Sequence, residues 1–224
     1  MAMILSIDTA VQSSICLSND ENSLGESANP LEKDSAAWLH TAIQQLLAQH
    51  NVSLQQLDAI AISYGPGSYT GLRVGMAAAK GLCYACNLPL ITLNTLQIMA
   101  SAAVKETTAD LFCPMIDARR MEVFTALYNS SLEEVMPSTN MILEQGAFND
   151  WLQNNNICFL GNGSEKAKAV IQHERAVFSP IKSSAKNMVL LALQKFQKGQ
   201  FAELAYSEPF YGKDFHSPFF KKNY

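Results

Sequence analysis

Two aspartates, Asp8 and Asp117, stand at matching places in two similar segments of the chain. ILSIDTAVQSSICLS and CPMIDARRMEVFTAL align when these aspartates are superimposed, and each segment contains an apolar run, Ile-Asp, a short loop and a second apolar run. Paired carboxylates that face each other across a cleft are suited to holding a divalent cation and the phosphates of a nucleotide. Ile-Asp before a hairpin is also a common local pattern, so internal duplication and coincidence both stay open on this evidence.

The loops that follow the two aspartates differ in what they offer to an anion. The first has the hydroxyl groups of Thr9, Ser13 and Ser14 but no Lys or Arg, which predicts weak phosphate binding. The second loop contains Arg119 and Arg120. Two arginines in a turn can clamp an anion, but more often they form a solvated surface or a partner contact.

A glycine-rich stretch, SYGPGSYTGLRVGMAAAKGLCYA at residues 63–85, follows a predicted strand and runs into a predicted helix. Gly65, Gly67 and Gly71 give it the GxGxxxG outline of a dinucleotide-binding turn. However, Pro66 removes one backbone N–H, and no acidic residue follows in NLPLITLNTLQ to bind a ribose hydroxyl. The Gly-Lys-Ser/Thr of a P-loop is also missing, so this stretch is not predicted to bind a nucleotide.

The helix that follows this stretch presents two stripes. One stripe nearly lacks side chains. Because each interior glycine lowers helix stability by about 0.5–1 kcal/mol relative to alanine, we expect a close contact that compensates for this loss. That contact is either the protein's own sheet or another protein, and spacing alone does not decide. The first stripe consists of Gly71, Gly75, Ala78 and Leu82, bordered by Leu72, Met76 and Ala79, and the second of Arg73, Ala77, Lys80 and Tyr84.

Cys83 and Cys86 form a CxxC motif, which occurs both in zinc sites and in redox pairs. No second pair follows at ligand spacing, and the four histidines are scattered. The motif lies near the predicted C-terminal end of a helix, where the helix dipole does not lower a thiol pKa. We therefore expect reduced thiols and no metal site.

The composition limits the possible functions. The 224 residues are 48% hydrophobic, enough to bury one large core or two modest ones. Charged residues make up 16% and the net charge is −4, so there is no basic field that would hold a nucleic acid by itself. MAMILSIDTA lacks the basic segment of a signal peptide, and Lys80 interrupts the most apolar long segment. A cytoplasmic protein without a membrane span is expected.

Hydrophobic patterning predicts strands that alternate with helices. MILSID and SSICLS indicate a hairpin, whereas LDAIAISYG and LPLITL are typical of strands buried on both faces. Helices are predicted over residues 34–49, after the glycine-rich stretch, and over residues 95–104. This alternation favours an α/β fold with a mixed sheet and flanking helices.

These motifs, taken in order, resemble a known superfamily. Two hairpins with an aspartate at the end of the first strand are similar to the phosphate-binding hairpins of actin, sugar kinases and Hsp70. Within that superfamily, ILSIDTA…SSICLS, LDAIAISYGPGSYTGLRVGMAAAKGL and MIDARRMEVFTALY resemble the bacterial TsaB (YeaZ) family, the inactive paralogues of the tRNA-modifying enzyme TsaD. The similarity is specific over roughly the first 130 residues and weak beyond them.

The resemblance implies two actin-like, ribonuclease H-like α/β domains. The first covers residues 1–110 and carries the glycine helix, and the second covers 111–224 and is smaller and truncated. FLGNGSEKA, residues 159–167, is the one candidate for a turn around the adenosine of a nucleotide, in degenerate form. The degenerate nucleotide loops implied by the resemblance contain Asp8, Thr9, Asp117, Arg119, Gly161 and Gly163, none of them catalytic.

The family's role implies a non-catalytic scaffold in the synthesis of threonylcarbamoyladenosine next to the anticodon of tRNAs. This chain would bind and activate TsaD, engage the ATPase TsaE, and form a homodimer when TsaD is absent. Its partners would use ATP and magnesium, this chain would need no cofactor, and tRNA would be contacted only within the complex. The interface implied by the resemblance consists of Gly71, Leu72, Gly75, Met76, Ala78, Ala79 and Leu82.

Two further family features fall on this sequence. TsaD relatives carry a HxxxH metal pair on the helix that corresponds to residues 34–49, where this chain has Asp34 and Trp38, with His40 out of register. The catalytic metal is therefore expected to be absent. In the tail SEPFYGKDFHSPFFKKNY, residues 209–211 are expected to pack on the body, and the part beyond Gly212 to be disordered or to contact a partner.

Two other functions stay open from the sequence. One is a kinase-like ATPase that uses Asp8 and Asp117 around magnesium. The other is a metal nuclease of the ribonuclease H type, which would need further carboxylates near Asp8. Glu122 and Asp58 are the available candidates.

Overall fold

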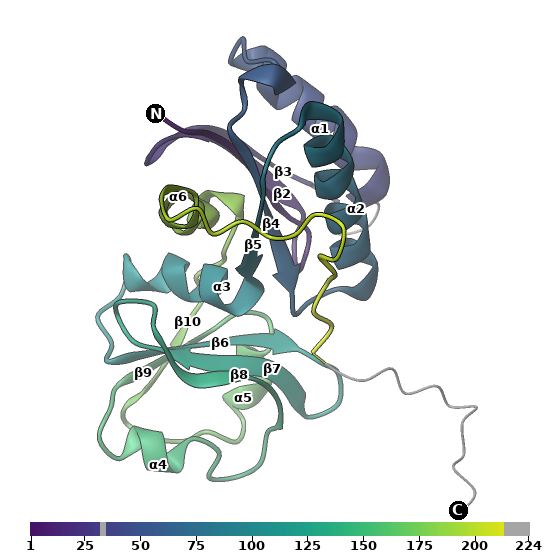
Figure 1. The fold of residues 1–224 in the computed structure, drawn as a ribbon. Coiled ribbons are helices and arrows are strands. Elements are labelled where there is room, and N and C mark those ends of the chain that lie inside the picture. The colour runs from purple at the N-terminus through teal and green to yellow at the C-terminus, as the bar shows by residue number, and fades with distance from the viewer. Residues whose placement is uncertain (32–34, 213–224) are drawn as a thin grey trace, which may run out of the picture.

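The computed structural model of the protein describes residues 1–31 and 35–212, in two lobes that each contain a five-stranded sheet (Figure 1). Asp34, which occupies the first position of the HxxxH pair of TsaD relatives, lies outside the described residues. So does the tail beyond Gly212, whose expected disorder or partner contact concerns residues that are not described.

The first sheet has the order β3-β2-β1-β4-β5. Strand β1 pairs antiparallel with β2 and parallel with β4, so it lies at the centre of the sheet and is buried along nearly its whole length. The parallel strand β4, AIAISYG, is buried on both faces, as its continuous apolar run predicts. The strands are β1 (Met3–Asp8), β2 (Ser14–Asn19), β3 (Asn22–Ala28), β4 (Ala59–Gly65) and β5 (Leu90–Asn94).

The second sheet repeats this topology in the order β8-β7-β6-β9-β10. β6 pairs antiparallel with β7 and parallel with β9, just as β1 pairs with β2 and β4. Asp8 and Asp117 end the corresponding strands β1 and β6, so the predicted duplication is confirmed. The strands are β6 (Leu111–Asp117), β7 (Glu122–Tyr128), β8 (Glu134–Ile142), β9 (Ile157–Leu160) and β10 (Ala176–Ser179).

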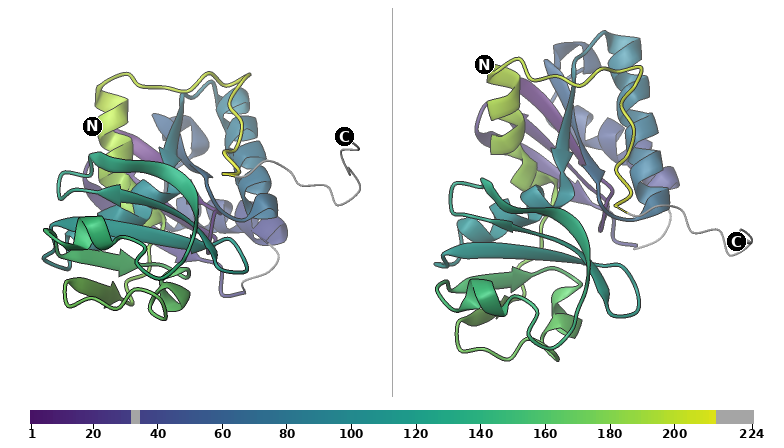
Figure 2. Two further views of the ribbon diagram at one scale, coloured as in Figure 1. Left: turned by 90° about the horizontal axis from the view of Figure 1, so that it is seen from below. Right: turned by 60° about the horizontal axis from the view of Figure 1, so that its bottom comes forward.

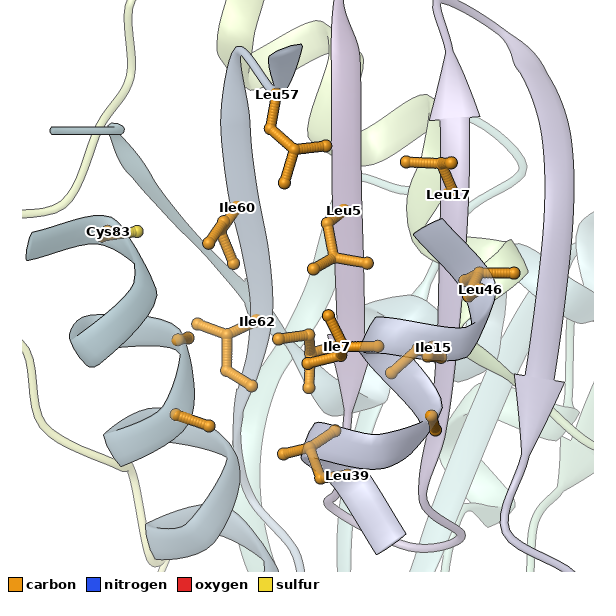
Figure 3. Close-up of a cluster of buried hydrophobic side chains, with 14 of the residues drawn as sticks. Leu5, Ile7, Ile15, Leu17, Leu39, Leu46, Leu57, Ile60, Ile62 and Cys83 are labelled. Atoms are coloured by element: carbon orange, nitrogen blue, oxygen red, sulfur yellow. The ribbon is translucent and has the colours of Figure 1, made fainter. Parts of the chain in front are cut away.

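Helices cover both faces of the first sheet and give an α/β, actin-like fold. α1 and α2 pack on one face, where leucines and isoleucines of β1, β2 and β4 form a continuous core (Figure 3). η2 and α6 cover the other face, and α3 lies between the sheets and packs on β6 (Figure 1). The helices are α1 (Ser35–Gln49), η1 (Leu54–Gln56), α2 (Tyr69–Cys86), α3 (Thr95–Val104), α4 (Asn149–Leu152), α5 (Ser164–Ala167), η2 (Ala185–Met188) and α6 (Val189–Gln197).

The chain after β10 returns to the first lobe. The resemblance implied instead that all of residues 111–224 belong to the second domain. Beyond α6 the chain runs across the first lobe and along α2 (Figures 1 and 2). Ala202 forms a β-bridge with Leu90, and the Phe210 amide donates to the Tyr64 carbonyl at 2.7 Å. The Tyr211 ring packs 4.8 Å from the Tyr69 ring, so the expected packing of residues 209–211 on the body is confirmed. Among the described residues, no helix is long and apolar enough to cross a membrane.

Candidate functional site

Helix α2 starts directly after the glycine-rich turn that follows β4. The Ser68 hydroxyl caps its first turn by accepting a hydrogen bond from the Gly71 amide at 3.2 Å. The helix ends at Cys86, and the next residue, Asn87, adopts the left-handed conformation and donates its N–H to the Cys83 carbonyl. Ser68 N also donates to the Ala10 carbonyl at 2.7 Å, which ties the start of α2 to the loop after β1.

The glycine stripe of α2 faces the protein's own sheet. A Cβ at Gly71 would overlap the Thr9 carbonyl oxygen, and a Cβ at Gly75 would overlap Thr9 Oγ1 and lie 3.0 Å from Ile62 Cδ1. These glycines therefore let the helix pack closely on the β1–β2 loop and on β4. The expectation that this stripe is a partner surface is wrong, because its small residues already serve internal packing. The residues of the predicted interface that pack internally are Gly71, Leu72, Gly75, Met76, Ala78 and Ala79, which are buried, and Leu82, which is half-buried against the first core.

The opposite side of α2 faces solvent and is called here the outer face. The middle of this face lacks large side chains and is called the shallow strip, since Ala77 and Gly81 are exposed there one turn apart. A Cβ at Gly81 would have no atom within 4 Å. Tyr84 is 84% exposed next to this shallow strip. The Lys80 ammonium holds the returning C-terminal segment along one side of the helix by donating to two of its carbonyls. The outer face consists of Thr70, Arg73, Ala77, Gly81, Tyr84 and Ala85.

A cleft of about 450 Å³ lies between the two lobes, where the β1–β2 and β6–β7 loops meet. The first lobe contributes Ala10, Val11 and the start of α2, and the second contributes residues 116–119 with Asn162. This is the place that paired aspartate hairpins predict for phosphates and a cation. Whether it can bind them depends on the state of the two carboxylates.

Asp8 is buried below the cleft and does not line it. Its Oδ1 accepts hydrogen bonds from Ser63 Oγ at 2.7 Å and from the Ala10 amide at 3.0 Å. Burial raises the pKa of this carboxyl above its ordinary value, and the two hydrogen bonds oppose that shift in part. A carboxyl in this setting fixes the loop after β1 and is poorly placed to bind a cation. Thr9 is buried beside it, and its backbone N–H donates a hydrogen bond to Ser63 Oγ at 3.3 Å.

The substitution Asp8→Asn is expected to raise the melting temperature at neutral pH. Because the folded state raises the Asp8 pKa, it holds the proton more tightly than the unfolded chain, so this carboxyl lowers stability as pH rises above 3.8. Asparagine keeps the Oδ1 acceptor and cannot ionise. Thermal melts between pH 4 and pH 7 should show a gain that grows with pH. A loss of stability at pH 7 would show that an ionised carboxylate is needed there.

Asp117 lines the cleft, but its carboxylate is occupied by the protein itself. Lys166 Nζ lies 2.7 Å from Asp117 Oδ1, and the Arg119 amide donates to the same oxygen at 2.7 Å. The hydrogen bond from Lys166 is the largest cause of a lowered Asp117 pKa. The same ammonium donates to the carbonyls of Arg120, at 3.0 Å, and of Glu122. The Lys166 ammonium is thus bound to the carboxylate and carbonyl oxygens at the tip of the β6–β7 hairpin.

The other predicted loop residues are divided between the cleft and the core. Arg119 lines the cleft and, with Arg120, has positive φ angles of 68° and 49° that close the β6–β7 turn. Gly161, at a φ of 95°, and Gly163 pack against β6, where Gly163 N donates to the Met115 carbonyl at 3.0 Å. Gly161 and Gly163 therefore shape the turn between β9 and α5 and do not line the cleft. Sequence reasoning missed Asn162 and Lys166, and the polar residues within FLGNGSEKA were the available signal.

The carboxylates considered for a nuclease do not converge on Asp8. Asp58 lies at the opposite end of the first sheet, where its Oδ2 accepts the Met3 amide at 2.6 Å, and Glu122 belongs to the second sheet. Among residues 1–31 and 35–212, no three His, Cys, Asp or Glu side chains lie close enough together to hold a metal. Cys83 is buried, which raises its thiol pKa to about 12, and it forms no disulfide with Cys86.

The sequence and the fold of this chain are similar to those of known proteins. The chain is 32% identical over 178 residues, 75% of each chain, to a Bacillus subtilis protein named tRNA threonylcarbamoyladenosine biosynthesis protein TsaB. It is 28% identical over 219 residues to the protein of that name from Escherichia coli, covering 93% of each chain. This chain belongs to the TsaB (YeaZ) family.

Two further comparisons extend the TsaB family assignment. A family model described as TsaD: tRNA N6-adenosine threonylcarbamoyltransferase matches residues 29–214, and so spans both lobes. The solved structure of YeaZ from Pseudomonas aeruginosa has a TM-score of 0.82 at 25% identity, covering 94% of this chain and 100% of that one. TsaB-family relatives are thus named for tRNA threonylcarbamoyladenosine biosynthesis, and their fold is the fold described here.

Proposed function

We propose that this chain is a non-catalytic subunit in the synthesis of threonylcarbamoyladenosine in tRNA, which binds a TsaD-type transferase and activates it. The observation that carries the proposal is the state of the cleft. Asp8 is buried and bonded to its own sheet, and the charge of Asp117 is already balanced by Lys166, so the two carboxylates do not form a pair that faces a metal-bound nucleotide. A TsaD-like fold without a working centre supports a partner's chemistry better than a reaction of its own.

The outer face of α2 is the surface we propose for the partner. Ala77 and Gly81 allow a second helix to approach closely, and the neighbouring Tyr84 supplies a large exposed aromatic ring. The buried stripe behind it holds this face rigidly to the sheet, so little ordering is needed on binding. The same face would serve a homodimer when the transferase is absent.

Activation requires that the surface distinguishes two states of the partner. A scaffold that binds the competent conformer more tightly shifts the partner's population toward it by the difference in binding free energy. The remaining roles follow the same proposal: TsaE joins the complex, the partners use ATP and magnesium, and tRNA is held by the assembled complex in the cytoplasm. The net charge of −4 supports a shared contact with tRNA over an independent one.

Size-exclusion chromatography with light scattering tests the pairing. The chain is mixed with the TsaD-type subunit from the same source, and each protein is also run alone. We expect a heterodimer in the mixture, formed at the expense of the homodimer. Two separate peaks at micromolar concentrations would contradict the proposal.

A further inference from the structure

A second cavity, of about 470 Å³, lies at the other end of the first sheet from the cleft. The cleft adjoins the β1–β2 loop, whereas this cavity adjoins the turn between β2 and β3 at the opposite end of β2. Its other walls come from α3, from the turn between β7 and β8, and from η2 with the start of α6. Both lobes therefore contribute to one open pocket, whose volume lies within the range of about 300–1,000 Å³ typical of small-molecule sites.

Hydrogen bonds fix the walls of this cavity to one another. Ser101 Oγ on α3 donates to the Asn187 carbonyl of η2 at 2.9 Å, and Gln97 Nε2 of the same helix donates to the Leu132 carbonyl at 3.2 Å. The amide that starts η2, Ala185 N, donates to Ser14 Oγ of β2 at 2.9 Å. The cavity is thus held open by the fold itself, and little conformational entropy would be lost when it is filled.

The lining combines an apolar base with cationic groups. Val104, Leu132, Val189 and Leu191 provide aliphatic surface, and Val189 and Leu191 belong to the core on the far face of the first sheet. The cationic groups are Lys105 and Lys186, both exposed. In the part of the chain that the structure describes, neither ammonium forms a hydrogen bond or an ion pair. Glu21 is the one carboxylate among the lining residues, so the lining has a net positive charge in a protein whose net charge is −4.

We propose that this cavity binds a small amphipathic anion, a carboxylate or phosphate joined to an apolar group. In this proposal the two ammonium groups bind the acid group and the aliphatic residues contact the apolar group; Ser130 and Ser131 also line the cavity. Because the walls come from both lobes, a bound ligand stabilises their native arrangement. The site is separate from the cleft and from the outer face of α2, so it stands independently of the proposed role in tRNA modification.

The fluorescent probe 8-anilinonaphthalene-1-sulfonate, an aromatic sulfonate, tests this proposal on the full chain. We expect one saturable site in a fluorescence titration and a rise in melting temperature on binding. The double variant Lys105→Met/Lys186→Met should bind about tenfold more weakly or worse, because it loses both charge-assisted contacts. Lys198→Met removes the same charge from an exposed position outside the cavity, and should bind like the wild type.

Competition identifies the ligand chemistry. Octanoate or octyl phosphate should displace the probe, the better of the two showing whether carboxylate or phosphate is preferred, whereas 1-octanol should not displace it. Three results would each overturn the proposal: binding without saturation, equal affinity in the double variant and the wild type, or displacement by octanol as effective as displacement by the acids. A fall in melting temperature with the probe would also overturn it, because that result indicates binding to the unfolded chain.

Discussion

Alanine at Gly71 is expected to destabilise the folded monomer by about 1–3 kcal/mol, whereas alanine at Gly81 in the same helix stabilises it by about 0.5–1 kcal/mol. A Cβ at Gly71 meets the backbone carbonyl of Thr9, which cannot move without displacing the β1–β2 loop. A Cβ at Gly81 meets nothing within 4 Å, so only the gain in helix propensity remains. Both variants replace glycine by alanine in α2, and they differ only in whether the new methyl group faces the sheet or the solvent.

Urea unfolding of the two variants and the wild type measures this difference in the free energy of unfolding. Gly75→Ala should follow Gly71→Ala in sign, because its Cβ meets the buried Thr9 side chain and Ile62. A bulky residue at Gly75 therefore tests folding and not pairing. Equal effects at Gly71 and Gly81 would contradict the inward orientation of the glycine stripe.

Arginine at Ala77 is expected to weaken pairing with a TsaD-type subunit by about 100-fold or more, which corresponds to about 2.8 kcal/mol. Ala77 lies in the shallow middle of the outer face of α2, where a long charged side chain would prevent close approach and would have to be desolvated. The stability of the monomer should change by less than about 0.5 kcal/mol, because the site is exposed.

The matched control for this variant is Ala169→Arg, the same change at an exposed position of the second lobe. Titration calorimetry against the TsaD-type subunit compares both variants with the wild type. Full affinity in Ala77→Arg would remove the outer face of α2 from the interface. An equal loss in Ala169→Arg would attribute the effect to net charge and not to position.

Much of the fold could be predicted because local pattern and burial agree. The continuous apolar runs of β1, β4 and β5 and the helical spacing in α1 correspond to what the structure shows. Strand β3 was missed because NSLGESA is a largely exposed edge strand without a continuous apolar run. The repeated Ile-Asp hairpin predicted the duplicated topology, but the return of α6 to the first sheet depends on contacts distant in sequence.

The candidate site was predicted less completely than the fold. The spacing of the α2 stripes was correct, but which stripe faces inward depends on Thr9 and Ile62, which other strands bring into place. Leu72 and Met76 beside the glycines, compared with Arg73 and Lys80 on the other stripe, were the signal that favoured internal packing. The pairing of Asp117 with Lys166 joins residues 49 positions apart, and no local pattern predicts it.

The central claim is tested most directly by following threonylcarbamoyl transfer to tRNA in a reconstituted mixture with this chain as the only variable. The mixture contains the adenylate-forming enzyme, the TsaD-type transferase, TsaE, ATP, threonine and bicarbonate. We predict that modification stops without this chain, returns with the wild type, Asp8→Asn and Asp117→Asn, and does not return with Ala77→Arg. Modification that continues without the chain, or that requires either aspartate, would contradict a non-catalytic subunit acting through the outer face of α2.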